Sequence, residues 1–373
     1  MNAYRTSDGL RDLLRLLRIA DCARSLSFSQ WDVVLRLARH SRLLAVIDQR
    51  IADVPGLEAA IPERVTGHLR AARNYVTHRV ELLKMELRDL DRALPRDLPI
   101  VLLKGAAYVA QDLRVARGRL PGDVDLLVAR EHLERAESAL IEGGWKTDIT
   151  DAYDQRYYRR WSHELPPMRI PGHALEVDLH HAITPVTARF QASQELLWSG
   201  AAQPRGQRYM VLHPADQIIH AAVHLFQDSN LAGRLRDLVD IDALIRQHLI
   251  TAEDWNVFCE RAAAHGMERP VWYALAHCTK WLGTSTRLSR PLPKPASARI
   301  AGMDWIFSRC CPPRLPEEGV GVGIRLACLL ATARYHWLRM PVWLLFPHLL
   351  RKSLRRLGVQ LKTVARPGHI ARA

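Results

Sequence analysis

The chain has 373 residues and a formal net charge of +14, with 48% hydrophobic and 25% charged residues. This composition excludes a disordered or fibrous protein, and the length suggests two or three structural units at roughly 100–200 residues each. Six cysteines without a CxxC pair exclude a disulfide scaffold and argue against a zinc ribbon. The N-terminus is polar and has no signal-peptide pattern, so we expect a reduced, cytoplasmic protein.

The positive charge is concentrated at the C-terminal end. Residues 319–373 contain ten Lys or Arg and no Asp or Glu, so they carry +10, whereas the other 318 residues carry only +4. A body with so little excess charge argues against a long nucleic acid as partner. Apolar residues 343–346 beside cations at 351–356 are typical of a helix that lies on the inner face of a membrane, and equally of a packed helix with a solvated basic end.

The first part of the chain, residues 1–94, reads as a helical region. Leucines at helical spacing begin near residue 10, and a second apolar stripe over residues 33–37 follows Ser29, a candidate N-cap. A long run from residue 62 to residue 94 is rich in Arg, Leu and Glu at helical spacing. We therefore expect several helices here and no strand.

Residues 95–213 have a mixed pattern, which predicts a small α/β core. The expected elements are a buried strand at 98–103, a helix at 106–113, a turn at 119–123, a strand at 123–128, a helix at 130–142 and a strand at 174–180. The last strand alternates strictly between polar and apolar residues. Two of these strands carry closely spaced acidic residues.

The pattern becomes helical again over residues 214–290. Helices are expected at 217–226, 234–248 and from 253 to about 281. A proline-rich linker then opens a tail over residues 291–373, with further helices at 324–336 and 342–357. The predicted fold class is α+β, a small mixed sheet flanked by N-terminal and C-terminal helical regions.

Four acid-x-acid pairs occur, about as many as chance would give, so their context must decide their meaning. Two of them, Asp89/Asp91 and Asp240/Asp242, lie in helical patterns, where residues two apart point in nearly opposite directions. The other two, Asp123/Asp125 and Glu176/Asp178, lie on predicted strands, where residues two apart share a face. If these strands are neighbours, three or four carboxylates converge, and a divalent cation such as Mg²⁺ would relieve their repulsion.

Three short segments then suggest a family. Residues 103–105 (Leu-Lys-Gly), 119–128 (Arg-Leu-Pro-Gly-Asp-Val-Asp-Leu-Leu-Val) and 175–180 (Leu-Glu-Val-Asp-Leu-His), with His163 between them, are similar to the uncharacterised bacterial nucleotidyltransferase family of the polymerase-β-like superfamily. The downstream helical unit with His220, His224 and Asp240 belongs to the resemblance, which covers roughly residues 10–250.

The resemblance implies a nucleotidyltransferase palm. It also implies an enzyme that transfers a nucleoside monophosphate from an NTP, with ATP as the first candidate, to a hydroxyl and releases pyrophosphate. Asp123, Asp125 and Asp178 would be the catalytic carboxylates and the ligands of Mg²⁺ or Mn²⁺. The residues expected to contact the nucleotide are Lys104, Gly105 and Arg119. Those expected to support the carboxylates are Glu176, His180 and His163. The acceptor would be a small molecule, a sugar, a peptide or a protein side chain.

Other interpretations stay open beside this one. Ala106 stands where the wider superfamily has a serine, and His181 stands where the family more often has tryptophan, so a non-catalytic binding or scaffold protein on the same fold is the alternative. Lys104 could simply end a strand, and Arg119 could pair with a nearby acid. His220 and His224 lack the glutamate of a zinc-protease helix, which favours packing, and Asp240 is expected to brace helices.

Overall fold

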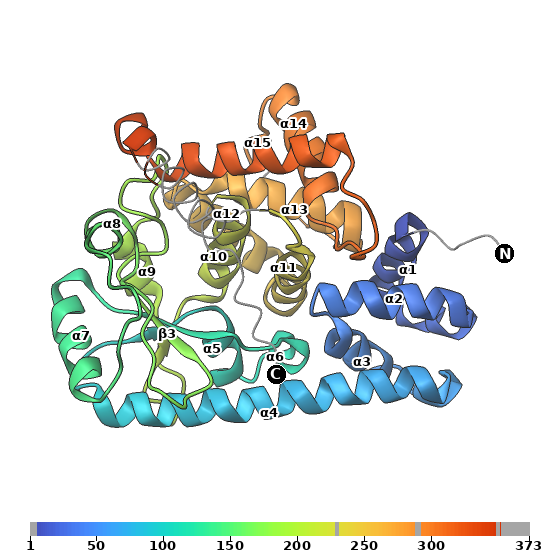
Figure 1. The fold of residues 1–373 in the computed structure, drawn as a ribbon, viewed down its shortest axis with the longest axis horizontal. Coiled ribbons are helices and arrows are strands. Elements are labelled where there is room, and N and C mark those ends of the chain that lie inside the picture. The colour runs from blue at the N-terminus through green and yellow to red at the C-terminus, as the bar shows by residue number, and fades with distance from the viewer. Residues whose placement is uncertain (1–5, 228–230, 288–291, 348–350, 352–373) are drawn as a thin grey trace, which may run out of the picture.

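The computed structural model describes residues 6–227, 231–287, 292–347 and 351. They form an α+β fold in which helices surround one four-stranded sheet, as the sequence predicted (Figure 1). The strands are β1 (Val101–Leu102), β2 (Asp123–Leu127), β3 (Glu176–His180) and β4 (Met210–Val211). Their order is β3-β2-β1-β4, with β2 parallel to β3, β1 parallel to β4, and β1 antiparallel to β2.

The N-terminal region is helical, as expected. Its elements are α1 (Thr6–Arg18), η1 (Ala20–Ser25), α2 (Phe28–His40), α3 (Leu44–Ala52), η2 (Glu58–Ala60) and α4 (Glu63–Ala93). The cap predicted at Ser29 is wrong, because Ser27 caps α2. The Ser27 hydroxyl accepts from the Gln30 amide, and the Gln30 side chain accepts from the Ser27 amide, so two amides at this helix end are satisfied reciprocally.

The helix α4 runs along one side of the molecule, beneath both the N-terminal helices and the sheet region (Figure 1). Its buried Glu86 fixes it to the core. Trp145 Nε1 donates to one Glu86 oxygen at 3.0 Å, and His173 Nδ1 lies 2.7 Å from the other. Pairing both oxygens offsets the cost of burying this carboxylate.

The core contains more elements than the sequence predicted. Its helices are α5 (Lys104–Ala110), α6 (Arg114–Gly118), η3 (Arg130–His132), α7 (Leu133–Glu142), α8 (Ala152–Trp161) and α9 (Gln194–Gly200). The first strand is only two residues long, and Pro99, which has no amide hydrogen, stands before it. The helix α8 was not predicted, and no residue of that helix is fully buried.

The C-terminal helices cover the other side of the sheet region. They are α10 (Pro214–Phe226), α11 (Leu235–His248), α12 (Ala252–Ala264), α13 (Glu268–Leu282), α14 (Ser297–Cys310) and α15 (Val322–Arg339). The single helix expected from 253 to 281 is wrong: the chain breaks at Gly266, whose φ of 65° lies in the left-handed region that favours glycine. Residues 342–347 are helical, and the rest of the helix expected up to 357 lies outside the described residues, apart from Arg351.

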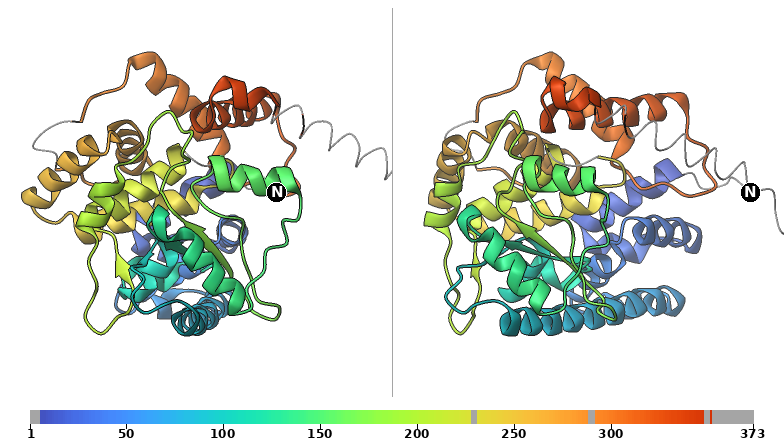
Figure 2. Two further views of the ribbon diagram at one scale, coloured as in Figure 1. Left: turned by 90° about the vertical axis from the view of Figure 1, so that its left-hand side faces the viewer. Right: turned by 60° about the vertical axis from the view of Figure 1, so that its left-hand side comes forward.

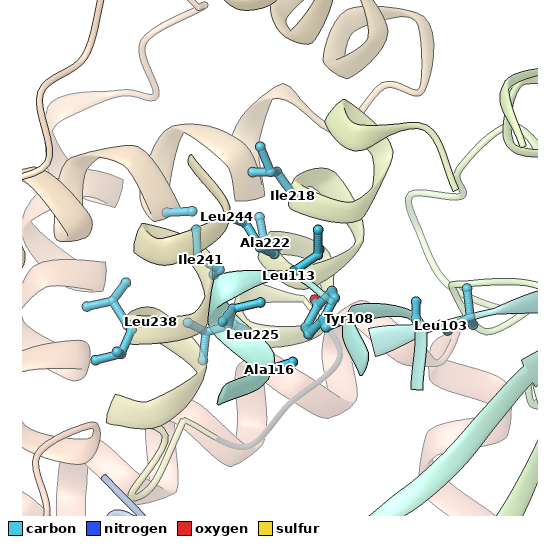
Figure 3. Close-up of a cluster of buried hydrophobic side chains, with 14 of the residues drawn as sticks. Leu103, Tyr108, Leu113, Ala116, Ile218, Ala222, Leu225, Leu238, Ile241 and Leu244 are labelled. Atoms are coloured by element: carbon cyan, nitrogen blue, oxygen red, sulfur yellow. The ribbon is translucent and has the colours of Figure 1, made fainter. Parts of the chain in front are cut away.

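An apolar cluster joins α10 and α11 to the helices that follow β1 (Figure 3). Its labelled members are Leu103, Tyr108, Leu113, Ala116, Ile218, Ala222, Leu225, Leu238, Ile241 and Leu244. All ten are buried, so they hold the C-terminal helices firmly against α5 and α6. In two further views, α14 and α15 lie on the side of the molecule opposite α4 (Figure 2).

A substitution at Gly118 can test how tightly α6 packs on α3. A Cβ atom added at Gly118 would lie 2.8 Å from the Val46 Cα, a backbone atom that cannot move aside. We expect Gly118→Ala to lower the free energy of unfolding by about 1–3 kcal/mol. Gly67→Ala, at an exposed position of α4 with open space around it, should raise it by about 0.5–1 kcal/mol. Urea denaturation measures both changes, and a Gly118→Ala protein as stable as the wild type would contradict the tight packing.

Candidate active site

The two acidic strands are neighbours. β2 and β3 pair in parallel, with Asp123 opposite Glu176 and Asp125 opposite Asp178. The residues between them, Val124, Leu126, Val177 and Leu179, are fully buried in the core. Because side chains alternate along a strand, the acidic residues share the other face of the sheet. The sequence prediction that carboxylates from two separated segments meet on adjacent strands is therefore confirmed.

Asp125, Asp178 and His180 form a group with metal-ligand geometry. One ligand atom from each lies within 4.8 Å of the other two. Asp125 is buried, and its Oδ1 accepts from Lys104 Nζ at 2.8 Å and from His180 Nε2 at 2.9 Å. The carboxylate pair is thus next to two groups that can carry positive charge.

Two carboxylate oxygens in this group have no hydrogen-bond partner. They are Asp125 Oδ2 and Asp178 Oδ1, and both are buried. A buried acceptor without a donor costs roughly 1–3 kcal/mol, and a bound cation would remove that cost. Oxygen ligands on a rigid pair of strands are what Mg²⁺ and Mn²⁺ prefer, so the residues present fit such an ion.

The pKa values of the two aspartates diverge. Burial raises the pKa of Asp178 to about 7, and the nearby Asp125 charge adds to this. Burial would also raise the pKa of Asp125, but the Lys104 ammonium and the hydrogen bond from His180 outweigh it and hold that pKa well below its usual range. The Asp125 charge, followed by burial, raises the pKa of Asp123. Asp125 is therefore the permanently ionised member, and Asp178 is the one that exchanges a proton near neutral pH.

Lys104 reaches Asp125 because of an unusual backbone conformation. Its φ of 43° lies in the left-handed region, which is uncommon for a side chain other than glycine. It is the first residue of α5, directly after β1, and the Leu103 amide donates to the Asp125 carbonyl at 3.0 Å. Burial would lower the pKa of Lys104, but the charges of Asp125 and Asp123 outweigh it and raise that pKa. The ammonium is therefore held in the charged form at the carboxylates.

Gly105 and Arg119 form a second buried arrangement beside the first. A Cβ at Gly105 would lie 2.1 Å from Arg119 Nη1, so the glycine leaves space for the guanidinium. Arg119 Nε donates to Asp240 Oδ2 at 2.8 Å, and its guanidinium lies 5.6 Å from the centre of the Tyr108 ring. Asp240 thus braces α11 against the core, as expected. The predicted contact of Arg119 with a nucleotide stays a prediction.

Glu164 is a site residue that the sequence analysis missed. Residues 163–165 run beside the end of β3, where the Leu165 amide donates to the Leu179 carbonyl and the His181 amide to the His163 carbonyl. Glu164 Oε2 consequently lies 3.6 Å from His180 Nδ1 and 3.7 Å from His163 Nε2. A ligand atom from each of the three residues lies within 4.8 Å of the others. The sequence feature that could have indicated Glu164 is its position directly after His163.

The other predicted residues have different surroundings. Glu176 lies on the expected face but is exposed at the start of β3, and Asp123 is half-buried opposite it at the start of β2. His220 and His224 are on α10, where burial and then the Lys104 charge lower both pKa values, that of His220 to about 3. These two histidines are neutral at physiological pH. Tyr158 of α8 is close to the site, since burial and the charges of Glu164 and Asp178 raise its pKa to about 12.

The comparison with protein families decides the class. A family described as "Uncharacterised nucleotidyltransferase" matches residues 27–283. The chain belongs to this nucleotidyltransferase family, and it is a transferase. No curated protein and no solved structure matches the chain. The match runs from just before α2 to the end of α13, so it includes the sheet and both buried arrangements and ends before α14 and α15.

Replacing Asp178 tests whether this residue is a metal ligand or a structural acid. Above pH 7 the ionised, buried Asp178 lowers the stability of the metal-free protein, because its folded pKa of about 7 exceeds the ordinary 3.8. We expect Asp178→Asn, measured in EDTA at pH 8, to raise the free energy of unfolding by about 1 kcal/mol or more. This gain should shrink as the pH falls toward 4, where both proteins carry a neutral side chain.

Added Mn²⁺ should raise the unfolding midpoint of the wild type and leave that of Asp178→Asn unchanged, as thermal unfolding would show. Glu260→Gln, at an exposed position of α12 outside the site, is the control and should behave like the wild type in both measurements. An Asp178→Asn protein that is less stable in EDTA at pH 8, or equally stabilised by Mn²⁺, would contradict this account of the site.

Proposed function

We propose that this transferase moves a nucleoside monophosphate from an NTP, ATP being the first candidate, to a hydroxyl group and releases pyrophosphate. The observation that carries the proposal is the pair of buried, unpartnered oxygens of Asp125 and Asp178 on adjacent parallel strands beside the Lys104 ammonium. Membership of a nucleotidyltransferase family gives the reaction class. Positioning and charge neutralisation would supply most of the rate enhancement.

The acidic strands would hold the divalent cation. Asp125 and Asp178 each offer a buried oxygen that has no hydrogen-bond partner. Asp123 lies two residues before Asp125 on the same face of β2. When bound, Mg²⁺ or Mn²⁺ supplies positive charge to the phosphate oxygens of the nucleotide. His180 would orient Asp125 through their 2.9 Å hydrogen bond, and Glu164 Oε2 lies 3.6 Å from the other ring nitrogen of His180. The centre of the His163 ring lies 5.3 Å from that of His180.

Side chains of the protein can help to neutralise the phosphate charge of the NTP and to activate the acceptor hydroxyl. In the transfer, the acceptor oxygen bonds to the α-phosphorus, the bond from that phosphorus to the bridging oxygen breaks, and pyrophosphate leaves. Asp178 would help to hold the divalent cation that activates the acceptor hydroxyl for loss of its proton. The Lys104 ammonium is suited to neutralise phosphate charge once a divalent ion has taken over its role at Asp125. Gly105 and Arg119 are proposed to line the nucleotide side of the same site.

The acceptor is proposed by class only: a small molecule, a sugar, a peptide or a protein side chain. The low excess charge of residues 1–318 supports this choice over long nucleic acid. Tyr158 and Glu164 lie close enough to Asp178 for their charges to interact with it, and they are the residues proposed to meet the acceptor.

A binding protein without transfer activity is the second candidate. The ion pair between Lys104 and Asp125 favours it, because it already neutralises one carboxylate oxygen without a metal. Ala106, at the position of the superfamily serine, removes a hydroxyl that could contact the triphosphate. Both candidates bind an NTP with Mg²⁺, and only the transferase releases pyrophosphate.

The test measures pyrophosphate release and transfer of α-phosphate-labelled NTPs across the acceptor classes with Mg²⁺ or Mn²⁺. We expect Asp125→Asn to reduce transfer by at least about a hundredfold, because it removes an ionised group from the site of charge neutralisation. Asp89→Asn is the control, since it alters an acid of another acid-x-acid pair, on α4 and paired with Arg92.

Each outcome has a clear meaning. Transfer that requires the metal and is lost in Asp125→Asn but kept in Asp89→Asn supports the proposed reaction. Metal-dependent NTP binding with no pyrophosphate release for any acceptor class assigns the chain to the binding-protein alternative. Transfer that survives Asp125→Asn would overturn the proposed role of the β2–β3 carboxylates.

A further inference from the structure

Helix α15 presents an apolar stripe to solvent. Val322 is 82% exposed and Leu329 64% exposed, and Leu326, Leu330 and Trp337 are exposed on the same helix. Their spacing of three, four and seven residues places them on one side. The other side carries the small buried residues Ala327 and Ala331 and packs on α14. An amphipathic helix normally turns its apolar stripe inward, and α15 turns it outward.

The helical turn at residues 342–347 extends this surface. Trp343 and Phe346 are 66% and 74% exposed, and Val342 is exposed beside them, while Leu344 is buried and anchors the turn. Together these side chains form what we name the apolar face: Val320, Val322, Leu326, Leu329, Leu330, Trp337, Val342, Trp343 and Phe346. Among the described residues, sixteen large hydrophobic side chains are exposed, and nine of them belong to this face. Such a concentration marks a binding surface.

The segment that carries the apolar face has charges of a single sign. From residue 319 to the end of the sequence there are ten Lys or Arg and no Asp or Glu. Arg325 and Arg351 are exposed on this segment, and Arg351 lies 3.5 Å from Asp151 at the start of α8. A segment that combines exposed tryptophans with ten cations and carries no acidic residue complements an anionic, partly apolar partner, which is the chemistry of an acidic phospholipid surface.

We infer that the apolar face docks on the surface of a bilayer that contains anionic phospholipids. The apolar side chains enter the interface, and the cations pair with the lipid headgroups. In the part of the chain that the structure describes, no helix is long and apolar enough to cross a membrane. Docking therefore leaves the helix lying along the surface.

A second copy of the chain is a poorer occupant. A dimer through this face would bring two segments of +10 together without any acidic residue from either to balance them. Residues 352–373 add six further cations and no acidic residue to the charge of the chain, which favours an anionic surface as the partner.

The apolar face is joined to the candidate active site. The segment that follows β3 reaches the end of α15, where the Arg189 amide donates to the Leu338 carbonyl at 2.9 Å and the Thr187 hydroxyl to the Arg339 carbonyl at 2.8 Å. The Arg189 guanidinium stacks 3.8 Å from the centre of the Trp337 ring. Docking thus holds the site in a defined orientation to the bilayer. This inference stands whether or not the proposed transfer occurs.

The experiment is flotation of the full chain with vesicles of phosphatidylcholine alone or of phosphatidylcholine with phosphatidylglycerol. We expect binding to the anionic vesicles only, and weaker binding as the salt concentration rises. Leu329→Asp should weaken this binding by about tenfold or more, because it removes apolar area that docking would bury and adds a negative charge. Ile141→Asp is the matched control, since Ile141 is 55% exposed on α7, outside the face.

Circular dichroism and the thermal midpoint of both variants establish that they are folded, which is expected because both positions are exposed. Absence of flotation with anionic vesicles, or equal flotation of Leu329→Asp and the wild type, overturns the inference. Gel filtration without lipid tests the alternative occupant, a second copy of the chain. If the wild type self-associates, Leu329→Asp does not, and neither binds vesicles, the apolar face would be a dimer interface and the inference would be overturned. Leu329→Asp should keep the wild-type transfer rate in the absence of lipid, so failure of this inference is distinguishable from failure of the proposed function.

Discussion

The structure depends on keeping Asp125 ionised inside the protein. Burial alone would drive this carboxylate to take up a proton, and two contacts prevent it, one from Lys104 and one from His180. Each partner is fixed by a separate piece of backbone: Lys104 by the left-handed turn between β1 and α5, and His180 by its place at the end of β3. The charge that these contacts stabilise is the main cause of the raised pKa of Asp123, and it adds to burial in raising the pKa of Asp178. Burial and this one charge together therefore shape the protonation of the neighbouring carboxylates.

A second buried ion pair holds the scaffold around it. Arg119 and Asp240 connect the segment before β2 to α11, and the absence of a side chain at Gly105 leaves room for the guanidinium. Both side chains are buried, and the Arg119 guanidinium lies over the ring of Tyr108, a member of the apolar cluster between α5, α6, α10 and α11 (Figure 3). Breaking such a pair leaves an uncompensated buried charge, which is costly. The helical region after the core is therefore part of what shapes the candidate site.

Much of the fold was readable from local sequence signals. The long helix α4, the acidic strand β2 and the alternating strand β3 have clear periodicity, because each has one face in the core. Elements with little burial or little length escaped: α8 has no fully buried residue, and β4 is two residues long. Glu164 escaped for a different reason, since it reaches His180 only through pairing of residues 163–165 with the end of β3.

The sequence by itself carried the family resemblance that implies the reaction class. It also determined that acidic residues share a face on two strands and that the charge is uneven, because residue types, their spacing and net charge are properties of the chain order. Only the tertiary structure decided which groups neutralise those carboxylates and which side of α15 faces solvent. The periodicity of α15 identifies an apolar stripe but does not say whether it turns inward, since that depends on packing against α14. Likewise the ion pairs of Lys104 and Arg119 join residues 21 and 121 positions apart, and no local pattern encodes such contacts.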